Sequence, residues 1–274
     1  MRTLAIIAAS ILDADFARLE HEVARVAAAG VDAVSLDVMD GHFVPRLTFG
    51  DVVAARIRSW IDLPIEIHLM VERPETWVRP MCDAGADMIV FHLEAANDPF
   101  EVIERIRTEE RLAGIALKHE TSIDEVPDGL LAAVDLVNLV AVPLGYGGSA
   151  SVADTFERIT ELRERIDAGG LDVAIEVDGG VKPTNAVRYV EAGADMLTVG
   201  TGIYHAADVD EAVRTLRDTT TGPADGRARA RLHRFLAVPS TETVDGATRR
   251  ARLDAARAAL DIPKNVWDPM SPFR

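Results

Sequence analysis

The pattern of the stretch Ala29-Gly30-Val31-Asp32-Ala33-Val34-Ser35-Leu36-Asp37 recurs twice, at residues 84–92 and 192–200. Each copy places an Ala-Gly-X-Asp start before an apolar run. That order predicts the end of a helix, a glycine in the left-handed conformation and then a buried strand. The three glycines are 55 and 108 residues apart, close to one and two multiples of about 54, the length of two strand–helix units. Residues 1–220 therefore hold about eight such units.

Apolar runs between turn signals predict eight strands. These strands are Leu4–Ala9, Asp32–Asp37, Pro64–Met70, Asp87–Leu93, Gly114–Leu117, Leu136–Val142, Val173–Asp178 and Met196–Gly200. Helical patterns with a polar outer face lie between them, as at Phe16–Ala29 and Ala153–Ala168. This alternation predicts an α/β protein with a parallel sheet, and eight strands close into a (β/α)8 TIM barrel. An open, doubly wound sheet is the alternative, but it does not require the even spacing.

Composition narrows the classes of partner. The chain has 274 residues, is 48% apolar and carries a formal charge of −16. An acidic protein is a poor partner for nucleic acid, because phosphate contacts need a basic face. No apolar run reaches the length of a membrane span. Cys82, the single cysteine, predicts a reducing cytoplasm as the compartment. The run Leu4–Leu12 weakly resembles a signal segment but fits a first strand equally well.

Polar side chains end most of the predicted strands. They are Ser10, Asp37, His68, His92 with Glu94, Lys118, Asp178 and Thr201. Active sites of such barrels lie at the carboxyl ends of the strands, so we expect several of these groups to converge there. Strand ends also meet water, which accounts for some of the polarity, and an aspartate there often caps the next helix.

Asp37, Asp178 and His68 form the most informative set. Two carboxylates on opposite sides of a flat substrate can remove a proton from one face and return it to the other. This requires environments that keep one ionised and the other protonated. A carbon acid beside a carbonyl also needs its enediolate stabilised. Aspartate and histidine are suitable ligands for a divalent transition metal, which could do this.

Glycines follow three consecutive strands at this same edge. They are Gly145, Gly147 and Gly148 after strand six, Gly179 and Gly180 after strand seven, and Gly200 before Thr201 after strand eight. Barrels commonly bind a phosphate through backbone N–H groups of the last two of these loops. Turns also need glycine, but the placement favours a phosphate site, which an acidic protein can build without lysines.

At these motifs the chain resembles the ribulose-phosphate 3-epimerase family, over residues 4 to about 215. The matching segments are Ala9-Ser10-Ile11-Leu12, Leu36-Asp37-Val38-Met39-Asp40-Gly41-His42-Phe43-Val44-Pro45, Ile67-His68-Leu69-Met70 and Glu176-Val177-Asp178-Gly179-Gly180-Val181. The second of them is highly specific. The resemblance implies the ribulose-phosphate-binding type of TIM barrel and inversion of carbon 3 of a ketose phosphate through an enediolate, in pentose phosphate metabolism.

The resemblance also implies roles for individual residues. Asp37 and Asp178 would be the acid/base pair and, with His68, the ligands of a divalent metal such as Zn, Fe, Mn or Co. It also implies substrate contacts for Ser10, Met39, Met70, Gly179, Gly180, Gly200 and Thr201. Apart from the resemblance, we expect Lys118, Gly145, Gly147 and Gly148 to bind substrate as well.

Departures from the family pattern fall at this site. Ser35 stands where the family has a metal-ligating histidine, so the metal would be held by three protein ligands and bind less tightly or be absent. Lys118 and His119 replace an Asn-Pro pair, the loop Pro143–Ser149 replaces Asn-Pro-Gly-Phe-Gly-Gly-Gln, and Val140 replaces a methionine. Lys118 could supply the missing positive charge, or it could be a solvated residue at the end of its strand.

Three functions follow from these observations. The first is an epimerase acting on ribulose 5-phosphate and xylulose 5-phosphate, or on a related ketose phosphate. The second is an isomerase or lyase on a sugar phosphate that uses Lys118. The third is a non-catalytic sugar-phosphate-binding protein. Retention of both Asp37 and Asp178 favours the epimerase, because a binder gains nothing from two carboxylates that face an anion.

The chain continues beyond the expected barrel. We expect the barrel in residues 1–217, a linker in 218–226 and a helical extension in 227–274, with Asp245–Leu260 as a helix. The extension is arginine-rich and ends in the apolar segment Val266–Phe273. We expect it to dock on the acidic barrel of its own or a neighbouring subunit, in a homo-oligomer.

Overall fold

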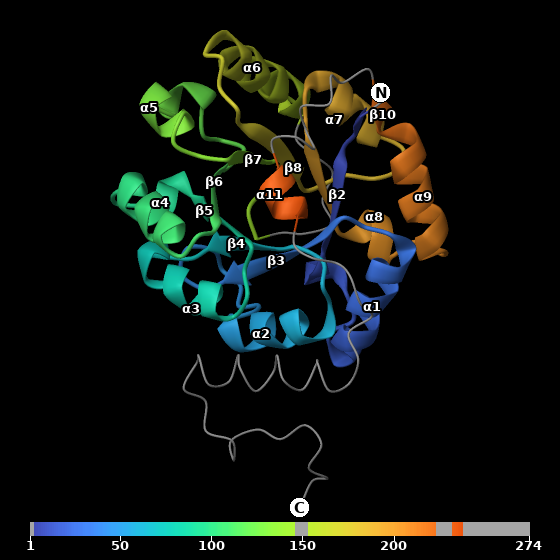
Figure 1. Cartoon of the computed structure of the whole chain (residues 1–274). Coiled ribbons are helices and arrows are strands. Elements are labelled where there is room, and N and C mark those ends of the chain that lie inside the picture. Colours follow the sequence, from blue (N-terminus) through green and yellow to red (C-terminus); the bar gives the residue numbers. More distant parts are fainter. Residues whose placement is uncertain (1–2, 146–152, 223–231, 238–274) are drawn as a thin grey trace, which may run out of the picture.

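The computed structural model describes residues 3–145, 153–222 and 232–237. Its centre is a closed barrel of eight parallel strands in chain order (Figure 1). The strands are β2 (Ile6–Ser10), β3 (Ala33–Met39), β4 (Ile65–Met70), β5 (Met88–His92), β6 (Leu112–Leu117), β7 (Leu136–Val140), β8 (Ala174–Asp178) and β9 (Met196–Val199). The predicted TIM barrel is therefore confirmed, and the open sheet is excluded because β2 pairs with β9.

Helices form an outer ring around the strands (Figure 1). They are α1 (Leu19–Ala29), α2 (Asp51–Trp60), α3 (Val78–Asp83), α4 (Pro99–Thr108), α5 (Asp128–Leu131), α6 (Thr155–Ala168), α7 (Ala186–Ala192), α8 (Thr201–Tyr204) and α9 (Val209–Thr219). Short 3-10 turns precede some of them: η1 (Ile11–Asp13), η2 (Phe16–Arg18), η3 (Pro74–Thr76), η4 (Leu93–Ala95) and η5 (Ile123–Glu125). No helix among the described residues is long and apolar enough to cross a membrane.

The glycines of the repeated pattern end helices as predicted. Gly30, Gly85 and Gly193 have φ of 89°, 98° and 120°, a region that glycine enters without a steric penalty. Each one follows the end of a helix and turns the chain toward the next strand. The repeat in the sequence therefore corresponds to the repeated unit of the barrel.

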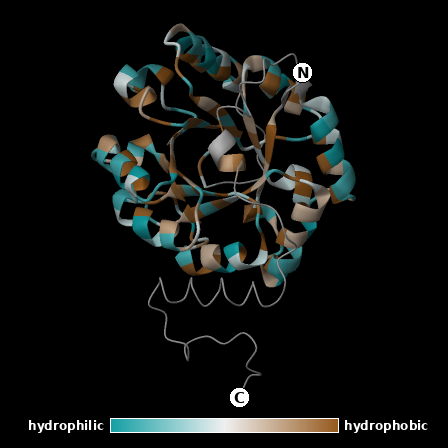
Figure 2. Cartoon of the chain, viewed as in Figure 1, coloured by the Kyte–Doolittle hydropathy of each residue, from teal (hydrophilic) through white to brown (hydrophobic). Residues whose placement is uncertain are grey.

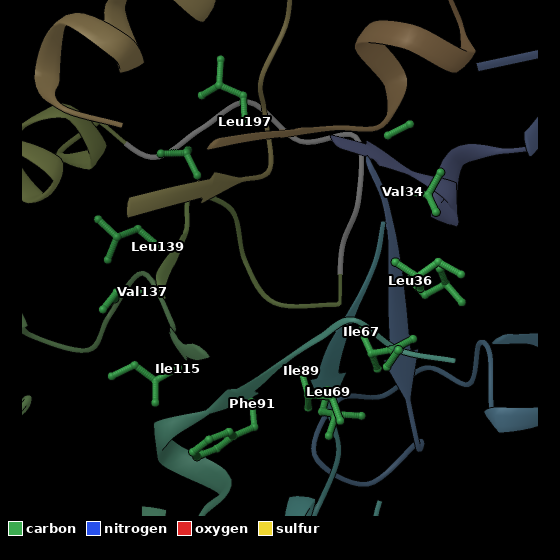
Figure 3. Packing of buried hydrophobic residues seen from close by; sticks show 14 of the residues in the cluster. Val34, Leu36, Ile67, Leu69, Ile89, Phe91, Ile115, Val137, Leu139 and Leu197 are labelled. Carbon is green, nitrogen blue, oxygen red and sulfur yellow. The ribbon is translucent and has the colours of Figure 1, made fainter. Parts of the chain in front are cut away.

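Strand residues alternate between two environments, because successive side chains point to opposite faces. In β3 and β4 the outward positions belong to the main apolar core between strands and helices: Val34, Leu36, Val38, Ile65, Ile67 and Leu69. Figure 3 shows this packing, and Figure 2 shows brown strands inside helices with teal outer faces. The inward positions of the same strands carry Ser35, Asp37, Glu66 and His68, all buried. The alternation therefore aims the polar groups at the barrel axis.

The segment after α9 remains attached to the barrel. Residues 218–219 finish α9, and β10 (Thr221–Gly222) pairs antiparallel with β1 (Thr3–Leu4). This differs from the expected linker at 218–226, whose first residues are held by backbone hydrogen bonds that local composition does not predict. Residues 223–231 and 238–274, including the expected helix Asp245–Leu260, lie outside the described residues.

A short piece of the C-terminal extension closes one mouth of the barrel. Helix α11 (His233–Leu236) lies inside the ring of strands in Figure 1. Leu232 and Phe235 are buried, at 0% and 1% exposure. They pack with inward residues that begin their strands: Ile6, Ala33, Met88, Leu112, Leu136, Ala174 and Met196. This plug, residues 232–236, therefore fills the amino-terminal mouth, opposite the strand ends where the site is expected.

Candidate active site

A cavity opens at the carboxyl ends of the strands. Its lining residues are Ser10, Leu12, Asp13, Asp37, Met39, His68, Met70, Val140, Val142, Leu144, Gly145, Asp178, Gly179, Gly180, Val181, Thr198, Gly200 and Thr201. Most of the residues expected from the sequence to bind substrate are in this set. Gly147 and Gly148 lie outside the described residues. Met39, Val44 and Met70 form a separate apolar cluster with Leu12, Phe43 and Leu144, so one wall of the cavity is apolar.

Three side chains meet at the base of the cavity. His68 Nδ1 lies 2.9 Å from Asp37 Oδ1 and 3.4 Å from Asp178 Oδ2. Asp37 and His68 are neighbours because β3 and β4 pair in register at these residues, whereas Asp178 ends β8. Ser10 Oγ donates to Asp37 Oδ2 over 2.9 Å. Both carboxylates therefore lie within 3.4 Å of the same imidazole nitrogen.

A second histidine, His92, fixes the orientation of the His68 ring. His92 Nδ1 lies 3.0 Å from Glu94 Oε2, and His92 Nε2 lies 3.0 Å from His68 Nε2. Burial lowers the pKa of His92 to about 4 in spite of Glu94. His92 is then neutral, and we infer that it donates from Nδ1 to Glu94 and accepts from His68 at Nε2. This arrangement leaves Nδ1 of His68 facing the two aspartates.

Charge interactions among Asp37, His68 and Asp178 shift the pKa values of His68 and Asp178. Burial opposes protonation of His68, but the Asp178 and Asp37 carboxylates outweigh it and hold the pKa of His68 well above its ordinary value. Burial and the charge of Asp37 raise the pKa of Asp178, against the opposing effect of His68. The site is thus a buried, charge-coupled group of acids around an imidazole, as acid/base chemistry requires.

The same three residues suit a divalent metal. One ligand atom from each of Asp37, His68 and Asp178 lies within 4.8 Å of the others. Carboxylate oxygens with an imidazole nitrogen are a donor set for Zn, Fe, Mn or Co, and the hydrogen bond from His68 to His92 is the outer contact that metal-binding histidines usually make. Ser35, two residues before Asp37 on the same face, is 1% exposed and its Oγ has no hydrogen-bond partner. It provides no imidazole as a fourth ligand.

Below this cluster lies a polar layer to which the sequence analysis assigned no role. Glu66 and Glu176 are fully buried on the inner face of β4 and β8. Thr198 Oγ1 donates to Glu176 Oε1 over 2.5 Å. Burial and the charge of Glu176 raise the pKa of Glu66, and burial raises that of Glu176 to about 8. Alternation along β4 places Glu66 on the same face as His68, and the same alternation along β8 places Glu176 inside the barrel with Asp178.

The glycine loops approach the cavity closely. Gly179 has φ of +100°, and a Cβ there would lie 2.6 Å from Val142 Cγ2. Gly145 also has a positive φ, of 81°. A Cβ on Gly200 would collide with the carboxylate of Asp13. These positions therefore require glycine for conformation or for space, in agreement with a site where the backbone itself contacts a ligand.

Gly179→Ala is expected to lower the free energy of unfolding by about 1–3 kcal/mol, because the new Cβ meets Val142 and φ is positive. Urea unfolding measures this. Gly129→Ala is the matched control, since no atom lies within 4 Å of its Cβ position and alanine favours the helix. Equal unfolding midpoints for the Gly179 variant and the parent would contradict the proposed close approach.

Lys118 lies against Phe43, which packs on the apolar cluster. Its Nζ is 4.2 Å from the centroid of the Phe43 ring, and its backbone N–H donates to Glu94 Oε1 over 2.8 Å. It is not among the residues that line the cavity. Asp13 does line it, although the sequence reasoning assigned it no role. Its place in the turn directly after β2 was the signal that could have identified it.

The fold and the site together define a class of protein: a (β/α)8-barrel enzyme with buried carboxylates and a histidine around a strand-end cavity. The chain belongs to the ribulose-phosphate 3-epimerase family, whose profile matches residues 6–204. Ribulose-phosphate 3-epimerase of Mycobacterium leprae is 40% identical over 212 residues, which cover 77% of this chain and 93% of that protein. The Escherichia coli K12 enzyme of that name is 38% identical over 213 residues, covering 77% and 94%.

These relatives place the chain in the isomerase class, among racemases and epimerases. Among solved structures, KGPDC from Streptococcus mutans matches with a TM-score of 0.59. It is 15% identical, and the match covers 80% of this chain and 98% of that one. Orotidine 5'-phosphate decarboxylase from Pyrococcus horikoshii matches with a TM-score of 0.56 at 18% identity, over 79% and 99%. At these identities the likeness concerns the fold alone.

Proposed function

We propose that this protein epimerises carbon 3 of a ketose phosphate, with ribulose 5-phosphate and xylulose 5-phosphate as the first candidates. One observation carries the proposal. Asp37 and Asp178 come from different strands, line the same cavity and both lie close to one nitrogen of His68. Inversion through a planar enediolate needs one proton acceptor and one proton donor, each on its own face of the substrate.

Asp37 and Asp178 differ in surroundings, as the reaction requires. Asp37 accepts a hydrogen bond from Ser10. Asp178 has a raised pKa, which favours its protonated form. We therefore assign Asp37 as the first base for one epimer and Asp178 as the acid that delivers the proton to the other face. The roles reverse for the opposite epimer.

Asp37, His68 and Asp178 would hold a divalent metal ion. When bound, that ion supplies positive charge that stabilises the enediolate. Protein groups do the rest: Ser10 orients Asp37, and the His92–Glu94 pair orients His68. Met39 and Met70 contribute to the apolar wall, which would limit access of water to the intermediate.

We assign the phosphate end of the substrate to the glycine loops. Gly179, Gly180, Gly200 and Thr201 line the cavity beside Asp178, and Gly145 borders it from the sixth loop. We also include Gly147 and Gly148 in the phosphate site, on the basis of the sequence alone. The position of Lys118 over Phe43 gives little support to an isomerase or lyase that uses this amine.

Deuterium incorporation tests the function. The purified protein is incubated with ribulose 5-phosphate in deuterated water, and the sugar is followed by NMR. We expect xylulose 5-phosphate to form with deuterium at carbon 3. Label at carbon 1 instead would indicate isomerisation, and absence of label together with tight binding of the sugar phosphate would support the non-catalytic alternative.

Ser35→His is expected to strengthen metal binding by at least about tenfold, because it adds an imidazole ligand two residues from Asp37 on the same strand face. Metal content after dialysis against a weak chelator measures this. Ser35→Ala is the control, since it adds no ligand. If the histidine variant retained no more metal than the alanine variant, position 35 would lie outside the metal site.

A further inference from the structure

The cavity contains an acidic residue where its phosphate end is expected. Asp13 closes η1, directly after β2, and lines the cavity. Burial raises the pKa of the Asp13 carboxyl, and the nearby backbone N–H of Thr201 opposes this rise. Asp13 also lies so close to Gly200 that a Cβ on that glycine would collide with it. Asp13 therefore contacts the Gly200–Thr201 backbone that the proposed function assigns to the substrate's phosphate.

A carboxylate at this place acts on a phosphate in two ways. It competes with a phosphate oxygen for the hydrogen bond that the nearby Thr201 N–H can donate. It also adds a negative charge near the charges of Asp37 and Asp178, and like charges in a partly buried site repel strongly. His205 opposes the rise in the pKa of Asp13, but its side chain is exposed, so solvent weakens its effect on Asp13.

The Asp13 carboxylate would strengthen, not weaken, the binding of a substrate group that donates a hydrogen bond. A carboxylate accepts hydrogen bonds from hydroxyl groups, and hydrogen bonds to charged acceptors are stronger than neutral ones. A sugar hydroxyl at this end of the cavity would gain such a bond, whereas a phosphate dianion would meet repulsion. The chemistry of one side chain thus changes the relative affinity for the two kinds of substrate end.

We propose that Asp13 is a specificity-determining residue whose charge weakens binding of the substrate's phosphate dianion at the Gly200–Thr201 backbone. The proposal rests on the epimerase function proposed above. It adds that this protein discriminates less strongly for phosphorylated over unphosphorylated ketopentoses than the same site would without the charge.

Asp13→Asn tests the proposal, because the amide keeps an oxygen that can accept from Thr201 but removes the charge. Asp13→Ser serves as a second variant if the first one folds poorly. Asp15→Asn is the matched control: Asp15 is exposed, caps η2 by accepting from Ala17 N–H, and does not line the cavity. For each protein we would measure kcat/KM on ribulose 5-phosphate and on ribulose, and the Kd of inorganic phosphate by titration calorimetry.

Removal of the Asp13 charge is expected to lower the Kd of inorganic phosphate by at least about tenfold. The ratio of kcat/KM for ribulose 5-phosphate to that for ribulose should rise by a similar factor, with no change in the Asp15 control. An unchanged ratio and Kd, or no phosphate binding by either protein, would overturn the role of Asp13. If no protein epimerised either sugar, the proposed function would fail, while the phosphate titration would still decide the role of Asp13.

Discussion

Asp178→Asn is expected to lower kcat for epimerisation by about a thousandfold, because the amide can neither release nor accept the proton at carbon 3. The side chains are nearly the same size, so the packing at the end of β8 should persist. Asp37→Asn should have a similar effect. Coupled assays of product formation measure both losses, and circular dichroism confirms that each variant is folded.

Isotope exchange separates the two carboxylates. A variant that retains one base can still exchange the carbon 3 proton of one epimer with deuterated water, without inversion. Asp37→Asn and Asp178→Asn should therefore label opposite epimers. Asp98→Asn is a suitable control, since Asp98 caps α4 and asparagine caps equally well. Full activity in either active-site variant would exclude the two-carboxylate mechanism.

Phe235→Ala is expected to lower the free energy of unfolding by about 3–5 kcal/mol, the usual cost of removing a buried aromatic ring. Phe235 is 1% exposed and packs with Leu232 against the first residues of the barrel strands. The turnover number should not change, since the plug fills the mouth opposite the cavity. Urea unfolding and steady-state kinetics measure the two effects.

Leu236→Ala is the control for the plug, because Leu236 is only partly buried against the same cluster. It should cost less stability than Phe235→Ala. An unchanged unfolding midpoint for Phe235→Ala would show that the plug does not hold the barrel closed in solution.

Sequence periodicity was sufficient for the barrel and for its central triad. The glycine repeat indicated the number of units, and alternation along β3 and β4 put Asp37 and His68 on the inner face. Both signals are local, since a glycine with positive φ and a two-residue period depend on the backbone of a few residues. The order of the strands then brought Asp178 to the same mouth.

Other features depended on contacts between distant segments. Lys118 follows a strand as expected, yet its amine lies over the Phe43 ring. A long, flexible side chain can reach several neighbours, so its position in the sequence does not determine which one it contacts. Asp13 lies in a turn, where no period predicts direction, and its role follows from Thr201 across the barrel closure. In the plug, Phe235 packs against the first residues of barrel strands that are distant from it in the sequence. The sequence by itself determined the barrel and its inward acids, whereas tertiary packing decided the surroundings of each group, since packing depends on neighbours that are far away in the chain.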